Sequence, residues 1–202
     1  MIFKNPIRLK TPVRNCSKTY SNYRSYKNYL AEDFNNRCGY CDSYDGWLGG
    51  TKIYHIDHFA PKSKFPHLEN TYENLIYSCP FCNLTKSDDW PSESEEVSIL
   101  NNIGYINPIL EEYNTYFYRD SRGNIFCEDK ETGHYMYNKL KFYLERHRVL
   151  WNLTKLMQVK KKIKVKLDIC KDKAEYEDLL KLYGELSLEF DEFLFYIVGD
   201  VS

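Results

Sequence analysis

Two pairs of cysteines constrain the fold of this chain more than any other feature of its sequence. Cys38 and Cys41 form one Cys-x-x-Cys pair, and Cys79 and Cys82 form a second. Two thiolates at this spacing can reach one ion from a single tight turn, and each pair contains a residue expected in such a turn, glycine in the first and proline in the second. Four sulfur atoms at roughly 2.3 Å around a tetrahedral ion describe a structural zinc site that holds the intervening segment as a loop.

The alternatives to zinc are a pair of disulfides, an iron–sulfur cluster or simple buried thiols. The first six residues lack the apolar run of a secretory signal, which disfavours disulfides. The spacing favours Zn²⁺ over the remaining alternatives. Cys16, Cys127 and Cys170 stand alone in the sequence, and we expect them to be ordinary thiols.

The 202 residues suffice for one domain of ordinary size, or for a small domain with a helical extension. No segment approaches the ~20 apolar residues of a membrane span, so we expect a cytoplasmic protein with no membrane partner. The 19 tyrosines suggest an aromatic-rich surface around a modest core.

The formal net charge of −1 hides an uneven distribution of charge. Residues 1–31 contain seven Lys or Arg and no acidic residue, and residues 139–166 contain ten against a single Glu. From residue 168 onward ten acidic residues face three lysines. Basic residues interleaved with tyrosines in the first segment favour contact with a phosphate backbone. For the lysine run 160–162 a solvated helix face is an equally good explanation.

Periodicity predicts a short helix over 23–34, a strand over 52–58 and a helix starting near Asn83. A hairpin is expected over 116–128 and a helical hairpin beyond residue 137. The final run 193–198 is apolar on every side, which indicates deep burial or a surface for a partner.

The segment between the cysteine pairs contains residue types suited to phosphodiester cleavage. His58 can take a proton from water, since an imidazole titrates near neutral pH. Asp57 and Asn83 offer hard oxygen ligands for a divalent ion, and His55 is a further candidate ligand. Lys86 lies one helical turn after Asn83 and could contact a phosphate. Neighbours on a strand point to opposite faces, so Asp57 and His58 can converge only if the strand ends or bulges there.

With these residues the chain resembles the HNH endonucleases, whose ββα-metal unit is a two-stranded hairpin followed by a helix. The family's Asp-His pair matches Asp57 and His58, its Asn before an apolar pair matches Asn74, and its helical His or Asn matches Asn83 with Lys86 three residues on. The resemblance implies that His58 is the general base and that Asn74 holds the loop and the base in position. It also implies that Asp57 and Asn83 bind the catalytic ion.

Asn83 stands where the third residue of the family name is often His, and an amide ligand favours Mg²⁺ or Mn²⁺. Many members of the family also have two Cys-x-x-Cys pairs that bind structural zinc. The layout further resembles the HNH subunits of bacterial anti-phage systems of the Septu and retron-associated kind. Those subunits have a basic lead-in, an Asn-Pro segment with a hairpin, here Asn107 and Pro108, and a helical end. The resemblance implies an ATPase subunit as a partner.

We therefore expect an α+β fold with four parts. These are a basic arm and helix (1–33), a nuclease core with zinc knuckles (34–92), a linker and hairpin (93–137), and a helical, partner-binding region (138–202). The expected activity is metal-dependent hydrolysis of DNA, most simply double-stranded. The alternatives are a non-catalytic zinc module that docks DNA or an ATPase, and a stand-alone restriction-type nuclease. His67, His134 and His147 lie outside the motif and are expected at the surface.

Overall fold

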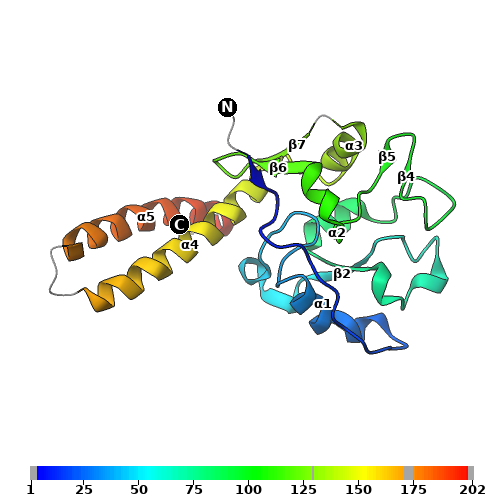
Figure 1. The fold of residues 1–202 in the computed structure, drawn as a ribbon, viewed down its shortest axis with the longest axis horizontal. Helices are drawn as coiled ribbons and strands as arrows, with labels where there is room; N and C mark the ends of the chain where they lie inside the picture. Colours follow the sequence, from blue (N-terminus) through cyan, green and yellow to red (C-terminus); the bar gives the residue numbers. More distant parts are fainter. Residues whose placement is uncertain (1–3, 129, 171–174, 200–202) are drawn as a thin grey trace. The chain divides into compact units, whose positions relative to one another are not determined.

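The computed structural model describes residues 4–128, 130–170 and 175–199 (Figure 1). The chain divides into two compact units, Met1–His147 and Arg148–Ser202, and each is described by itself. The first unit contains every residue of the predicted site. The segments expected as arm, nuclease core and linker are therefore parts of one compact unit. The mixture of helices and short sheets confirms the predicted α+β class.

A hairpin followed by a helix lies at the centre of the first unit. Its elements are β2 (His55–His58), β3 (Leu75–Ser78) and α2 (Pro80–Lys86), with the two strands antiparallel. Cys79 caps the helix, because its Sγ accepts a hydrogen bond from the Cys82 backbone N–H at 3.4 Å. Pro80 suits the first helical position, where the missing N–H has no intrahelical partner to lose. The predicted ββα unit is present.

Two of the predicted boundaries in this unit were wrong. The strand begins at His55 rather than at Lys52, because residues 50–52 form a 3-10 turn. Gly49 and Gly50 there have φ of +97° and +73°, a left-handed conformation that interrupts an extended strand. The helix begins at Pro80, so Asn83 lies in its middle and not at its start. The start of α2 was misplaced because its capping residue is Cys79, and cysteine is not one of the residue types by which a helix start is usually predicted.

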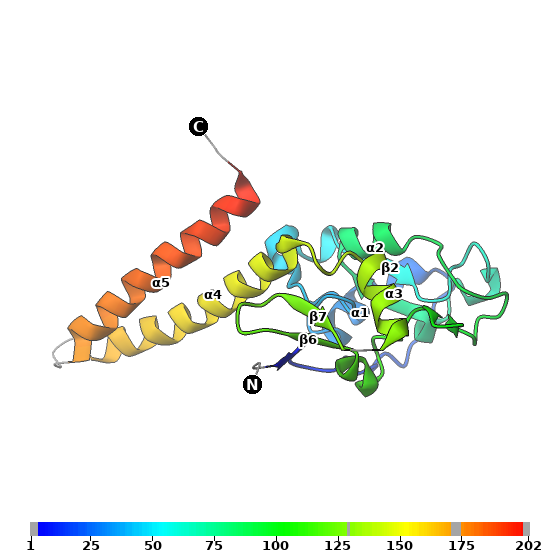
Figure 2. The same ribbon diagram turned by 90° about the horizontal axis from the view of Figure 1, so that it is seen from above.

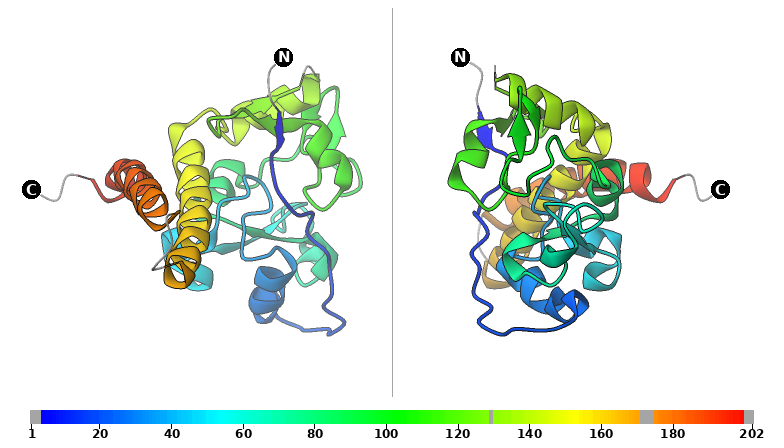
Figure 3. Two further views of the ribbon diagram at one scale, coloured as in Figure 1. Left: turned by 60° about the vertical axis from the view of Figure 1, so that its left-hand side comes forward. Right: turned by 90° about the vertical axis from the view of Figure 1, so that its right-hand side faces the viewer.

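The predicted helix over 23–34 is a 3-10 turn, Tyr23–Tyr26, that leads into α1 (Lys27–Asp33). The side chain of Asn22 caps the turn by accepting from the Arg24 backbone N–H at 3.0 Å. Leu30 on α1 is fully buried. Over residues 4–22 the described chain has no helix and runs along the first unit (Figure 3).

A second sheet lies elsewhere in the first unit, with the strand order β1-β6-β7 (Figure 2). Its strands are β1 (Asn5–Pro6), β6 (Phe117–Arg119) and β7 (Ile125–Cys127). The antiparallel pair β6–β7 confirms the predicted hairpin over 116–128. The remaining elements are β4 (Ile99–Leu100), β5 (Ile103–Gly104), α3 (Glu131–Lys139) and 3-10 turns at Asp45–Leu48, Pro66–Leu68, Tyr72–Asn74 and Glu111–Thr115.

Tyrosine fills much of the core of the first unit, contrary to the expectation of an aromatic surface. Tyr40, Tyr54, Tyr77, Tyr105 and Tyr113 are fully buried. Their hydroxyls are satisfied by hydrogen bonds, as in Tyr113, which donates to the Tyr40 carbonyl at 2.7 Å. A buried tyrosine contributes apolar area only if its hydroxyl finds such a partner.

The second unit contains most of α4 (Glu145–Ile169) and all of α5 (Glu175–Val198). The helices pack antiparallel, since the Lys160 ammonium lies 4.6 Å from the Phe190 ring centroid and Arg148 lies 5.5 Å from that of Phe193. The predicted helical hairpin is present. Leu188 and Phe195 on α5 are 70% and 62% exposed within this structure. Among the described helices, none has the length and apolar character needed to cross a bilayer.

Candidate active site

The four cysteines of the two pairs meet in one buried cluster. Their Sγ atoms all lie within 4.8 Å of one another, and all four are free thiols. The first turn is held against β3 by a hydrogen bond from the Gly39 N–H to the Tyr77 carbonyl at 2.8 Å. A Cβ on Gly39 would lie 2.6 Å from the Phe34 ring and 2.8 Å from Ile76, so only glycine fits this position.

The geometry and chemistry of the cluster fit Zn²⁺. Sulfur ligands at roughly 2.3 Å in a tetrahedron are about 3.8 Å apart, and Cys41 and Cys79 have their Sγ atoms 3.9 Å apart. Burial raises the pKa of the Cys38 and Cys82 thiols, whereas hydrogen bonds with the neighbouring thiols lower the pKa of Cys41. Four sulfur atoms this close cannot all ionise without a cation. A divalent ion would supply the missing charge.

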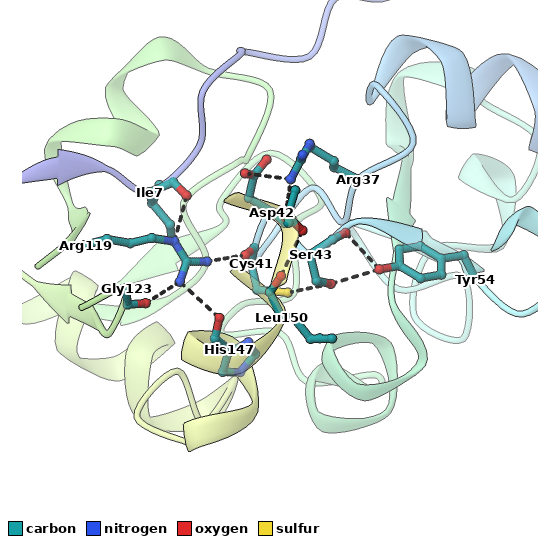
Figure 4. Close-up of polar contacts among 11 residues, drawn as sticks. Ile7, Arg37, Cys41, Asp42, Ser43, Tyr54, Arg119, Gly123, His147 and Leu150 are labelled. Carbon is teal, nitrogen blue, oxygen red and sulfur yellow. Dashed lines mark hydrogen bonds and ion pairs between the residues drawn. The ribbon is translucent and has the colours of Figure 1, made fainter. Parts of the chain in front are cut away.

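Arg119 and His147 support this cluster, and neither role was predicted from the sequence (Figure 4). Arg119 is buried and donates to the carbonyls of Cys41 at 2.8 Å and Gly123 at 2.7 Å. His147 is 2% exposed, so the prediction of a surface histidine was wrong. Its ring packs edge-on against Phe81, with centroids 5.9 Å apart. Neither ring nitrogen has a hydrogen-bond partner among the described residues.

A pocket of about 290 Å³ brings together three of the predicted catalytic residues. Asp57, His58 and Asn83 line it, together with Tyr23 and Lys62. The first two are consecutive in sequence and can share the pocket because β2 ends at His58. The strand therefore ends at this pair, as the convergence of Asp57 and His58 requires.

His58 is held in the form that a general base requires. Its Nε2 lies 2.9 Å from the carbonyl oxygen of Glu69, and a carbonyl can only accept, so Nε2 bears the proton. The neutral ring therefore has its lone pair on Nδ1. Burial lowers the pKa of His58, which keeps the ring neutral at physiological pH. The ring of Tyr23 packs edge-on against it, with centroids 4.8 Å apart.

Asp57 is buried and held by two donors on the same oxygen. Its Oδ2 accepts a short hydrogen bond from the Tyr40 hydroxyl, and the Lys86 ammonium lies 3.4 Å away. Burial raises the pKa of Asp57, and the charge of Lys86 opposes that shift. These contacts fix the carboxylate at the wall of the pocket.

The expectation that Lys86 contacts a phosphate needs correction. Its side chain is fully buried, and its ammonium donates to the His58 carbonyl at 3.0 Å as well as facing Asp57. Lys86 therefore positions Asp57 and His58 through buried contacts. Helical spacing places Lys86 on the same face of α2 as Asn83, but the part of that face that carries Lys86 is buried in the core.

Asn74 and Asn83 have different partners. The Asn74 amide accepts from the Ala60 N–H at 2.8 Å and donates to the Ala60 carbonyl at 2.9 Å, which closes the loop after β2. Asn83 donates through Nδ2 to Nδ1 of His55 at 2.9 Å. This orientation turns the amide oxygen of Asn83 away from His55. The contact makes His55 a partner of a candidate ligand.

Asp57 and Asn83 both line the pocket and carry the oxygen-donor groups expected as ligands of the catalytic ion. Mg²⁺ takes oxygen ligands, keeps several waters and is commonly bound by one or two protein groups together with substrate phosphates. Among the described residues, the cysteine cluster is the group of three or more His, Cys, Asp or Glu that could hold an ion. The pocket of Asp57 and Asn83 offers a sparser set of donors, with the carboxylates of Asp57 and Asp88 and the amide of Asn83 in its lining.

Comparison with known proteins agrees with this geometry. Residues 38–89 match the family model described as HNH endonuclease. Over 85 residues the chain is 33% identical to Septu protein PtuB of Bacillus mycoides (strain KBAB4). That match covers 35% of this chain, and the chain spans 28% of the length of the relative. No solved structure matches the chain.

Proposed function

We propose that this protein is a metal-dependent endonuclease that hydrolyses DNA phosphodiester bonds as the effector of a bacterial anti-phage defence system. The observation that carries the proposal is the pocket shared by His58, Asp57 and Asn83. In it a neutral imidazole, oriented by a backbone carbonyl, lies beside a carboxylate and an amide. A structural role explains the four cysteines but not this combination.

In the proposed reaction, Nδ1 of His58 accepts the proton of a water that attacks phosphorus in line. The Glu69 carbonyl and the Tyr23 ring fix the imidazole plane. Asp57 and Asn83 would hold Mg²⁺ or Mn²⁺, which supplies positive charge for the phosphate and the departing oxygen. The Asn74 amide keeps the loop at Ala60 closed, so that the base stays at one end of the pocket.

Zn²⁺ at Cys38, Cys41, Cys79 and Cys82 would be structural and take no part in the chemistry, since four thiolates leave no open coordination position. One such pocket cuts one strand. A double-strand break in double-stranded DNA therefore requires two copies of the chain or two successive events.

The likeness to Septu protein PtuB supports a place in anti-phage defence. We propose an ATPase subunit as the partner and the cytoplasm as the compartment. The residues of α5 that are exposed, among them Leu188 and Phe195, provide a surface for that partner. A non-catalytic zinc module is the competing function, and it would use the same fold without needing the base.

The test is nicking of supercoiled plasmid by zinc-loaded protein with Mg²⁺ or Mn²⁺. His58→Ala is expected to lower the rate by about 100- to 10,000-fold, the usual contribution of a general base. His67→Ala is the matched control, because this histidine is exposed and its Nε2 meets Glu95 at 3.0 Å, outside the pocket. Equal rates for wild type and His58→Ala would reject the proposed mechanism. Cleavage that appears only when the ATPase subunit is added would identify a gated enzyme rather than a stand-alone nuclease.

A further inference from the structure

We propose that a second pocket, beside the catalytic one, binds the sugar–phosphate backbone of the DNA strand next to the scissile phosphate. Arg24, Lys27 and Lys52 are its phosphate-binding residues. The identity of the ligand as DNA rests on the proposed function. The location and the charge of the pocket rest on the structure.

The two pockets adjoin each other, because they share lining residues. The second has a volume of about 770 Å³ and shares Tyr23, Ile56 and Asn83 with the catalytic pocket. His55, the partner of Asn83, also lines it. A strand whose phosphate occupies the catalytic pocket must leave it in some direction, and the larger pocket adjoins it across Asn83. Its volume lies within the roughly 300–1,000 Å³ of ordinary ligand sites.

The charge of the second pocket suits a polyanion. Arg24, Lys27 and Lys52 line it, and its described lining residues include no carboxylate. The catalytic pocket differs, because Asp57 and Asp88 both line it. The exposed side chains of Ile53 and Leu84 add apolar surface against which a sugar or base edge can rest.

The structure also separates these cations from the other basic residues of the first 31 positions. Arg14 donates to the carbonyls of Tyr72 at 2.7 Å and Leu75 at 2.7 Å, and Arg8 donates to that of Leu110 at 2.8 Å. Those two guanidiniums hold the arm to the unit. Arg24 and Lys52 are exposed instead, and the Lys27 ammonium makes one long contact, 3.4 Å, to the Lys52 carbonyl.

A third pocket, on another side of Tyr23, fits a strand less well. It has a volume of about 280 Å³ and is lined by Lys62 and Glu69 as well as by Arg24, which it shares with the larger pocket. These two side chains form an ion pair at 2.8 Å, so the lysine is already neutralised there. The strand is therefore assigned to the larger pocket.

The experiment measures binding of a fluorescent 30-base-pair DNA duplex by anisotropy across a KCl series, in the His58→Ala background so that cleavage does not interfere. Arg24→Ala/Lys27→Ala/Lys52→Ala is expected to weaken binding at least tenfold. It should also reduce the slope of log K against log [KCl] by about 2 to 3, since each phosphate contact contributes about 0.9. Lys161→Ala/Lys162→Ala/Lys166→Ala removes the same charge from exposed positions of α4 and is expected to leave the slope unchanged.

An unchanged slope in the first variant, or an equal loss in the α4 variant, would overturn the proposal. Arg24→Glu alone guards against a folding defect, because the exposed side chain can reverse its charge without disturbing the core. It should weaken binding with an unchanged melting temperature. Plasmid nicking by the wild-type chain is measured in parallel. Absence of nicking both by the chain alone and with the ATPase subunit added, together with the expected change in slope, would reject the nuclease and keep the DNA-binding pocket. Nicking with an unchanged slope would reject only the pocket.

Discussion

At the scale of single residues, Asn74 shows how one side chain can control a site that it does not enter. Its amide is paired with both backbone groups of Ala60, and these hydrogen bonds are buried. Asn74→Ala leaves an N–H and a carbonyl without partners, so we expect a loss of about 2 kcal/mol in unfolding free energy. Loosening the loop that follows His58 should lower the cleavage rate about 100-fold, as small displacements of catalytic groups do.

The measurement combines thermal unfolding, zinc content and plasmid nicking. Asn74→Asp is the matched control, because its carboxylate still accepts from the Ala60 N–H but cannot donate to the Ala60 carbonyl. Its stability and rate should fall between those of wild type and Asn74→Ala. If Asn74→Ala cleaves at the wild-type rate, the loop does not need this clamp.

For single residues, the sequence predicted which side chains could form the site, but it did not predict the contacts that hold them in place. Asp57, His58 and Asn83 are predictable because their types and spacing follow from the chemistry. The partners of these residues are not, because Tyr40 and Glu69 contact them from distant parts of the chain and Glu69 does so through its backbone. A backbone carbonyl leaves no trace in the residue type.

At the scale of elements, we expect α2 to need the metal site in order to fold. It has seven residues, and isolated helices shorter than ~12–15 residues are marginal in water. Its cap is Cys79, and Cys82 lies in its first turn. We therefore expect that removal of Zn²⁺ by a chelator unfolds α2 and withdraws Asn83 from the pocket.

Far-ultraviolet circular dichroism, zinc content and nicking in excess Mg²⁺ are followed during the chelator titration, and all three should fall together. Cys79→Ser should behave like the chelated protein. Cys16→Ser is the control, since Cys16 lies outside the cluster. A zinc-free protein that retains its helix signal and still cuts DNA would show that the ββα unit folds without the ion.

Asp89 links the segment after α2 to α3. Its Oδ2 accepts from the hydroxyls of Tyr105 at 2.6 Å and Tyr135 at 2.5 Å, and the Lys139 ammonium lies 3.4 Å away. Burial by itself raises the pKa of Asp89, but these hydrogen bonds and the lysine outweigh it, and the net pKa is lowered. A carboxylate with a lowered pKa stabilises the fold above its unfolded pKa of about 3.9 and loses that effect as the pH falls through the folded value.

Asp89→Asn should therefore destabilise the zinc-loaded protein by about 1–2 kcal/mol at pH 7. The difference from wild type should persist down to about pH 4 and shrink as the pH falls below that value, through the lowered pKa of the folded state. Urea unfolding of both proteins at several pH values gives this difference directly. A difference that stays constant across the range would mean that the charge of the carboxylate is not the stabilising feature.

Elements were predicted in kind more reliably than in extent. The hairpin over 116–128 and the pair of long helices follow from alternation and helical spacing, which depend on local sequence alone. The arm over residues 1–20 was predicted as extended, but its attachment through Arg8 and Arg14 was not, because both bind carbonyls far along the chain. Charge counts alone cannot separate such structural cations from those available to a ligand.

At the scale of the whole molecule, the sequence left two explanations for the apolar run 193–198, deep burial or a surface for a partner. The exposed fractions of its side chains in α5 bear on that choice. Phe195 and Val198 are 62% and 55% exposed, so the packing of α5 against α4 within the second unit does not bury them. Acidic residues precede this run on the same helix, at positions 185, 189, 191 and 192. A surface of this kind suits a partner with an apolar groove and a basic rim.

Leu188→Glu/Phe195→Glu tests this surface. Both side chains are exposed, so the melting temperature should change by no more than about 2 °C, the usual range for surface substitutions. Nicking by the isolated chain should stay at the wild-type level, because neither residue lines the catalytic pocket. Co-purification with the proposed ATPase partner should be lost. The control Glu185→Ala/Glu189→Ala keeps the apolar residues and should only weaken it.

Light scattering on the isolated chain separates the ATPase from the other candidate occupant, a second copy of this chain. A monomer that joins the ATPase through α5 would support the proposed partner. A dimer that Leu188→Glu/Phe195→Glu converts to a monomer would show that the surface joins two copies, and the ATPase would then have to bind elsewhere. That outcome would also supply the two pockets that a double-strand break requires.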